Sequence, residues 1–196
     1  MERTAADPFF FGYGSLVNRR THGYAEAYQA RVTGWRRVWR HTDLRDAAFL
    51  SVEPAPGEEI EGLIAAVPGG DWQALDLRET GYDRLPLAEG LAHAATRPVT
   101  AHIYSVPAHR SAGMGARQPI LLSYLDVVIQ GYVREFGEAG AERFFHTTVG
   151  WDTTILDDRE APRYPRAQRL SARERGLVDA ALRALDVAVM PHPRGR

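Results

Sequence analysis

The sequence contains no cysteine and no lysine, and all 24 of its basic residues are arginine. Without cysteine there is no thiol nucleophile, no disulfide, no cysteine-ligated zinc and no iron–sulfur cluster. Without lysine there is no Schiff-base chemistry and no lysine general base. The lack of cysteine also agrees with a reducing compartment. Any chemistry must therefore depend on carboxylates, hydroxyls, histidines, arginines or the backbone.

Long apolar runs and a strong net charge are lacking as well. No run approaches the ~20 apolar residues of a membrane-spanning helix, and the first eight residues carry acids where a signal peptide has its apolar core. The formal net charge of −1 gives no reason to expect nucleic acid or an anionic membrane as a partner. We expect a cytoplasmic protein with a small-molecule ligand, and its oligomeric state stays open.

The length of 196 residues suits one medium domain. We therefore predict a single domain over residues 1–196, with residues 1–7 and 190–196 frayed. No repeat or linker divides the chain.

Metal binding is not indicated by the histidines. They are scattered, no pair has the spacing of metal ligands on one helix, and the His-Glu-X-X-His motif is absent. We expect no metal and no cofactor. The seven histidines are His22, His41, His93, His102, His109, His146 and His192.

One short stretch near the N-terminus stands out from the rest. Phe9–Phe11 predicts a buried strand, and it leads directly into Gly12-Tyr13-Gly14-Ser15-Leu16. Glycines on both sides of one tyrosine let the backbone turn sharply and approach a small ligand closely. Successive N–H groups in such a turn can bind a carboxylate or an oxyanion. The stretch is therefore a candidate binding turn.

Three well-known glycine motifs do not fit this turn. A dinucleotide fingerprint needs glycine where Val17 stands, and a phosphate-binding P-loop needs a lysine. A nucleophile elbow needs glycine at the positions of Tyr13 and Val17. A Gly-X-Gly pair at a strand end most often marks an ordinary turn. The remaining functional interpretation is a glycine-lined cradle in which Ser15 donates a hydrogen bond and is not a nucleophile.

The following residues predict an antiparallel meander and then mixed structure. Residues 17–29 should be loop with a short helical turn, and Gly34 should form a bulge within the next strand. A turn is expected at residues 54–57, and a charged loop should separate the last two strands. Besides Phe9–Phe11, the predicted strands are residues 30–41, 47–53, 59–67, 82–88 and 99–106.

Helices are predicted from caps and apolar spacing. Asp71 should cap a short helix that reaches about Arg78 and is ended by Gly81. Apolar residues at helical spacing predict a buried helix from Ile120 to about Phe136, after a loop at 107–119. The remaining predictions are a short helix at 138–145, irregular structure at 148–170, and a helix from a capping box at Ser171 to Leu185.

A charge cluster follows the first predicted helix. Arg78, Glu79 and Arg84 stand beside Gly81 and Tyr82. Such clusters are usually solvated helix ends. This one lies where the chain turns back into a strand, which makes it a candidate site. The two arginines could bind a substrate carboxylate bidentately or pair with Asp76 or Asp83.

Together these motifs carry a resemblance to a known family. Tyr13-Gly14-Ser15-Leu16, followed by a lone glutamate in Arg78-Glu79-Thr80-Gly81-Tyr82, resembles the gamma-glutamylcyclotransferase superfamily. The superfamily includes glutathione-specific ChaC-like enzymes, enzymes acting on gamma-glutamyl amino acids, and plant AIG2-like proteins. Ser123-Tyr124 at a helix start is a third match, and the resemblance spans about residues 9–135.

The resemblance implies an α+β fold, with a small, mostly antiparallel curved sheet or partial barrel and surrounding helices. It implies a cyclising lyase that converts a gamma-glutamyl substrate to 5-oxoproline and releases an amine or amino acid. Glu79 would be the general acid/base, and its pKa should be raised by apolar walls such as Phe11, Leu16 and Tyr82. The implied substrate-binding residues are Gly12, Tyr13, Gly14, Ser15, Leu16, Tyr82 and Tyr124.

The chain also departs from the family pattern. Leu16 stands where the common motif has asparagine, and residues 17–20 replace a tryptophan-rich segment of ChaC-like enzymes. The substrate therefore stays open among glutathione, gamma-glutamyl amino acids and gamma-glutamyl amines. Two other functions also stay open: a non-catalytic binding or regulatory module on the same fold, and hydrolysis of another amide by water that Glu79 activates.

Overall fold

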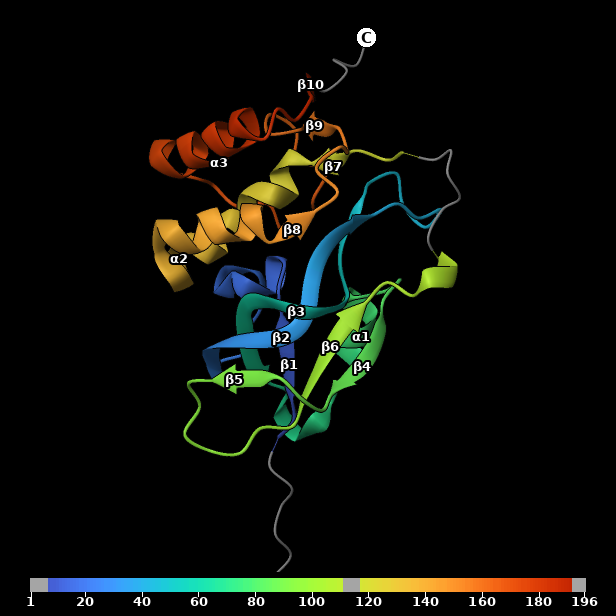
Figure 1. Ribbon diagram of the computed structural model, residues 1–196, viewed down its shortest axis with the longest axis vertical. Helices are drawn as coiled ribbons and strands as arrows, with labels where there is room; N and C mark the ends of the chain where they lie inside the picture. Colours follow the sequence, from blue (N-terminus) through green and yellow to red (C-terminus); the bar gives the residue numbers. More distant parts are fainter. Residues whose placement is uncertain (1–6, 111–116, 192–196) are drawn as a thin grey trace, which may run out of the picture.

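The computed structural model describes residues 7–110 and 117–191 (Figure 1). Within these residues one curled, half-barrel sheet and three helices make up most of the fold, which confirms the predicted α+β class. The strand order is β4-β6-β1-β3-β2-β5, and β8 also pairs with β2. Most neighbours are antiparallel; β1 with β6 and β2 with β8 are parallel. The strands are β1 Phe9–Gly12, β2 Ala27–Arg40, β3 Phe49–Ala66, β4 Asp83–Leu87, β5 Leu91–His93, β6 Ala101–Ser105 and β8 Thr148–Val149.

Strand β3 corrects the largest error of the strand prediction. Residues 47–53 and 59–67 do not lie side by side across a turn at 54–57. Both are part of one strand, which pairs with β2 before and after that segment. Opposite the predicted bulge at Gly34 the register jumps, so that Thr33 faces Glu59 while Trp35 faces Pro54. The Pro-Ala-Pro-Gly sequence therefore produces an irregularity within a long strand and not a reversal of the chain.

Strand β2 is also longer than predicted. It begins at Ala27, within the segment 17–29 that was expected to be loop with a short helical turn. That turn is the 3-10 helix η2 Arg19–Thr21, and a second 3-10 helix, η1 Ser15–Val17, precedes it. The expected charged loop between β4 and β6 contains β5, which pairs with β2. These short pairings depend on partners far along the chain, so local composition did not indicate them.

The helices lie close to their predicted positions. They are α1 Gln73–Arg78, α2 Leu122–His146 and α3 Ala172–Ala184. Asp71 is not the N-cap of α1, because Trp72 holds that position, although the Asp71 carboxylate accepts a hydrogen bond from the Gln73 amide. Gly137, at φ +69°, interrupts α2 where two helices were predicted. The capping box at Ser171 is present as predicted.

A second sheet lies beside α2 and α3 at one end of the molecule (Figure 1). It orders β10 Val189–Pro191, β9 Ile155–Asp157 and β7 Ile120–Leu121, all paired in parallel. Its strands correct two expectations: residues 148–170 are not wholly irregular, and Met190 and Pro191 are not frayed. The other residues expected to fray lie outside the described ranges, apart from Asp7, whose carboxylate accepts a hydrogen bond from Gly69.

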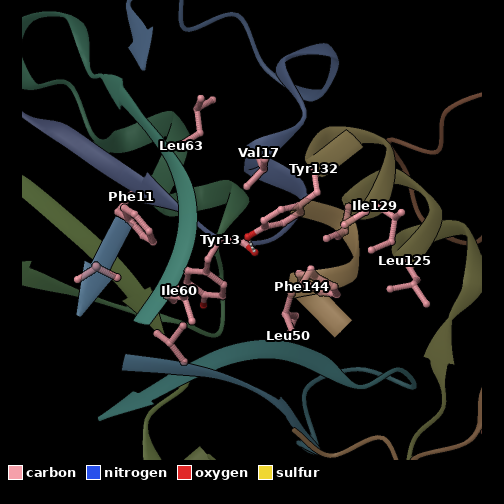
Figure 2. Close-up of a cluster of buried hydrophobic side chains, with 14 of the residues drawn as sticks. Phe11, Tyr13, Val17, Leu50, Ile60, Leu63, Leu125, Ile129, Tyr132 and Phe144 are labelled. Atoms are coloured by element: carbon pink, nitrogen blue, oxygen red, sulfur yellow. Dashed lines mark hydrogen bonds between the residues drawn. The ribbon is translucent and has the colours of Figure 1, made fainter. Parts of the chain in front are cut away.

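The phenylalanine strand β1 is buried on both faces of the sheet. Phe9 and Phe11 belong to the core between the sheet and α2, and Phe10 belongs to a smaller core that includes Leu75 of α1. Successive residues of a strand point to opposite faces, so an unbroken apolar run fits a strand covered on both sides. Figure 2 shows the larger core, where Tyr13 lies next to Tyr132 of α2. The chain that leaves β1 is therefore held between two packed layers.

Candidate active site

The turn after β1 depends on glycine because other chain atoms approach it closely. A Cβ added at Gly12 would lie 2.6 Å from the Cβ of Leu16. A Cβ added at Gly14 would lie 2.6 Å from the Tyr124 hydroxyl oxygen. Neither glycine has a positive φ, so the requirement is for space. The first turn of α2 thus places the Tyr124 hydroxyl directly against the backbone of the turn.

A small cavity of about 30 Å³ lies at this turn. All eight residues predicted for the site line it: Gly12, Tyr13, Gly14, Ser15, Leu16, Glu79, Tyr82 and Tyr124. The turn comes from β1, Glu79 from the end of α1, and Tyr124 from α2, so three elements distant in sequence meet here. Phe11, Leu50 and Tyr104 complete the lining.

Glu79 is the C-cap of α1, and its side chain is only 15% exposed. Burial raises its pKa above the ordinary value of 4.5, in the direction expected. The positive charges of Arg78, Arg166 and Arg45 act in the opposite direction and lower that pKa. Burial and the arginines thus have opposite effects on the pKa of the Glu79 carboxyl group. Such a balance suits a group that must both accept and give up a proton.

The two arginines of the predicted charge cluster have different partners. Arg78 pairs with Glu79 at 3.1 Å, and it also donates to the Ser15 hydroxyl and to the backbone carbonyl of Thr21. Arg84 pairs with Asp76 at 3.0 Å. Arg78 therefore connects the candidate acid to the binding turn. Arg84 instead pairs with Asp76, one of the two aspartates that the sequence offered as partners.

Four tyrosines surround Glu79, and burial raises the pKa of each phenol: Tyr13, Tyr82, Tyr104 and Tyr124. Two of them donate to backbone carbonyls, Tyr13 to that of Tyr104 at 2.6 Å and Tyr82 to that of Leu50 at 2.9 Å. These phenols stay neutral near pH 7. The walls of the cavity are therefore apolar where the rings lie and can form hydrogen bonds where the hydroxyls lie.

The turn is supported from behind by a buried polar cluster. The Tyr132 hydroxyl lies 2.9 Å from the carbonyl oxygen of Tyr13 and 2.7 Å from that of Glu61. Arg37, which is 1% exposed, donates to the same hydroxyl at 2.9 Å and to the Glu61 carbonyl at 3.0 Å. Nothing in the local sequence around Arg37 or Tyr132 indicated this cluster, because its members come from β2, β3 and α2.

A wider chamber of about 340 Å³ adjoins the small cavity. Leu50, Tyr82 and Tyr124 line both, so the two spaces lie side by side. The outer wall comes from residues 45–49 before and within β3 and from residues 163–166 after β9. Neither segment was predicted to line the site, because the start of a strand and an irregular stretch contain no motif that indicates a pocket.

Residues 7–110 and 117–191 contain neither a metal-binding cluster nor a membrane-spanning helix. No group of three or more histidine, aspartate or glutamate side chains there could hold a metal ion. None of the helices formed by these residues is long and apolar enough to span a bilayer.

Comparison with known proteins gives a consistent picture. Residues 10–121 match the family model described as gamma-glutamyl cyclotransferase, AIG2-like. No curated protein matches the sequence. A solved structure titled gamma-glutamyl cyclotransferase is similar, with a TM-score of 0.56 and 15% identity over 89% of this chain and 99% of that chain.

Two further structures share the fold. The uncharacterized protein loc79017 from Homo sapiens gives the same TM-score of 0.56 at 15% identity, again over 89% of this chain and 99% of that chain. YkqA from Bacillus subtilis gives a TM-score of 0.52 at 16% identity, over 74% of this chain and 56% of that chain. At these identities the likeness concerns the fold.

Proposed function

Because the chain belongs to the gamma-glutamyl cyclotransferase, AIG2-like family, we propose that it cyclises a gamma-glutamyl compound to 5-oxoproline and releases an amine or amino acid. The single observation that carries the proposal is the meeting of Glu79 with the Gly12–Leu16 turn around one cavity. A carboxylate with a raised pKa beside a glycine-lined turn provides both a proton carrier and a binding surface for a small polar group.

The reaction needs one nucleophile, and the substrate itself supplies it. The α-amine of the gamma-glutamyl group attacks the carbon of its own γ-amide, which forms the ring C–N bond of 5-oxoproline. The bond from that carbon to the leaving nitrogen then breaks. Glu79 accepts the proton that the attacking nitrogen loses and delivers it to the leaving nitrogen. No oxidant, reductant or water is consumed.

The protein's main contribution is to hold the substrate in the cyclising conformation. Fixing a reacting pair in the productive geometry can contribute roughly 7–11 kcal/mol, and a positioned acid/base adds about 10²–10⁴-fold. The small cavity accepts only one end of a substrate, so the turn, Tyr82 and Tyr124 would bind the gamma-glutamyl group there. The leaving group would extend into the outer chamber.

Glu79→Gln tests the proposal directly. The amide cannot carry the proton, so we expect the rate of 5-oxoproline formation to fall about 10²–10⁴-fold. Product is measured by mass spectrometry after incubation with glutathione, gamma-glutamyl amino acids and gamma-glutamyl amines. Glu89→Gln is the matched control, because Glu89 is exposed and does not line the cavity.

Three results would contradict the proposal in different ways. Unchanged 5-oxoproline formation by Glu79→Gln removes the role of Glu79. Open-chain glutamate as the product indicates hydrolysis. Binding of gamma-glutamyl compounds in a thermal-shift assay, with no turnover of any of them, indicates a non-catalytic binding module.

A further inference from the structure

The outer chamber is strongly basic. Arg45, Arg78, Arg163 and Arg166 line it, and Asp46 is the one acid among its lining residues. Of these arginines, Arg78 is already paired with Glu79. A concave wall with several charges of one sign focuses its field on whatever lies inside. The chamber is therefore suited to a negatively charged group.

The other three arginines of the chamber have no ion-pair partner in the described part of the chain, whereas most arginines there do. Arg45 donates to the Thr80 carbonyl and lies over the Phe49 ring at 4.9 Å. Within residues 7–110 and 117–191, the guanidinium groups of Arg163 and Arg166 make no hydrogen bond. All three residues thus line one space, where the guanidinium donors of Arg163 and Arg166, and the donors of Arg45 that are not bonded to Thr80, are available for a ligand.

Two of these arginines act on the reacting end of the site. Arg45 and Arg166 both lower the pKa of Glu79 through their charge, although only Arg78 touches it. A leaving group bound to Glu79 through its nitrogen would therefore lie between Glu79 and these side chains. A carboxylate fits the planar guanidinium fork better than a neutral group does.

We propose that Arg45, Arg163 and Arg166 form a subsite for a carboxylate on the leaving group, so that the released product is an amino acid or peptide with a free carboxylate and not a simple amine. This rests on the proposed function. Arg163 and Arg166 lie outside the residues that match the family model, so the preference would belong to this chain's own C-terminal part.

Three substrates that differ in one group test the subsite. Gamma-glutamyl-alanine carries the carboxylate, gamma-glutamyl-alaninamide replaces it with a neutral group of the same shape, and gamma-glutamyl-ethylamine lacks it. We expect kcat/KM for the acid to exceed that for the amide by about tenfold or more, the effect of one charge-assisted contact. Raising the salt concentration to about 1 M should reduce this ratio, since it shortens the screening length to about 3 Å.

Variants then assign the preference to the arginines. Replacing all three with glutamine should bring the acid-to-amide ratio close to one, and each single replacement should lower it in part. Both substrates are measured on the same variant, so the effect of the lost charge on Glu79 cancels in the ratio. Arg169→Gln is the matched control: Arg169 is exposed, lies in the same segment and does not line the chamber. It should keep the wild-type ratio.

Calorimetric binding of the same three compounds separates this inference from the proposed function. Tighter binding of the acid that is lost in the triple variant, with no 5-oxoproline from any compound, supports the subsite and contradicts the proposed reaction. Turnover with equal kcat/KM for acid and amide, unchanged in the triple variant, overturns the subsite and leaves the reaction standing. Equal binding of all three compounds without turnover contradicts both.

Discussion

At the scale of single residues, Glu79 holds the most informative position. Its pKa reflects two opposed influences: burial, which raises it, and three arginines, which lower it. Because folding raises the pKa on balance, the neutral carboxyl is favoured in the folded state. The stabilisation this gives is complete below about pH 4.5 and is lost as the pH rises through the folded-state pKa.

This balance predicts the pH dependence of the proposed reaction. A general base must be ionised, so kcat/KM should fall as the pH is lowered through a pKa above 4.5. Arg166→Gln removes a charge that lowers this pKa and should move the acidic limb to higher pH. The measurement is a pH profile of kcat/KM for gamma-glutamyl-alaninamide.

The pH profile of Arg169→Gln serves as the control and should match the wild type. An acidic limb at or below pH 4.5, or one that Arg166→Gln leaves in place, would show that Glu79 does not titrate as the structure indicates.

At the scale of elements, Asp158 joins the start of α2 to the segment that carries the chamber arginines. Its carboxylate is fully buried and accepts from the Ser123 amide at 2.8 Å, the Ser123 hydroxyl at 2.6 Å and the Arg163 amide at 2.8 Å. Tyr124 directly follows the anchored Ser123, and Arg163 is itself anchored through its amide. The chamber therefore depends on a buried contact between α2, which carries Tyr124, and the segment that follows β9.

Asp158→Asn tests this connection. The substitution replaces one carboxylate oxygen, which accepts hydrogen bonds, with an amide NH₂ group, which can only donate. At least one buried donor then loses its acceptor, so the free energy of unfolding should fall by about 2–3 kcal/mol. Urea denaturation measures the change. Asp152→Asn is the control, because its ion pair with Arg117 is largely exposed and contributes little. A stability of Asp158→Asn equal to that of the control would mean that the buried contact does not hold the two segments together.

At the scale of the whole molecule, the sheet and the helical layer meet at Tyr132 and Arg37. The Arg37 guanidinium is buried without a carboxylate: it donates to hydroxyls and a carbonyl and lies over the Phe144 ring at 4.8 Å. Burial raises the pKa of Tyr132 to about 12, so it remains a neutral phenol. Its hydroxyl reaches the Tyr13 carbonyl, which ties the packing of the layers to the binding turn.

Tyr132→Phe removes that hydroxyl and keeps the ring. One N–H of a buried charged group then loses its acceptor, so we expect a loss of about 2–3 kcal/mol in the free energy of unfolding. Denaturant unfolding of Tyr132→Phe and of Tyr24→Phe gives the comparison, because the Tyr24 hydroxyl makes no hydrogen bond in the described part of the chain. Equal stability of the two variants would contradict a supporting role for the cluster.

Local patterns predicted the helices well and the strands less well. The capping box at Ser171 and the apolar spacing along α2 are contained within a few turns, so they can be read directly from the sequence. Strand β3 passes through a Pro-Ala-Pro-Gly segment that normally indicates a turn. It continues because β2 pairs with it on both sides of the irregularity.

The sequence by itself determined the glycine turn after the three phenylalanines, because this motif consists of neighbouring residues. It indicated Glu79 as the acid that meets this turn only through the resemblance to a known family. Only the tertiary structure decided that Arg45, Arg163 and Arg166 share a chamber with them, and that Arg37 supports the turn from behind. An arginine carries the same charge wherever it stands in a sequence. What it can bind depends on whether folding gives it a partner, and the partners of these arginines are far away along the chain.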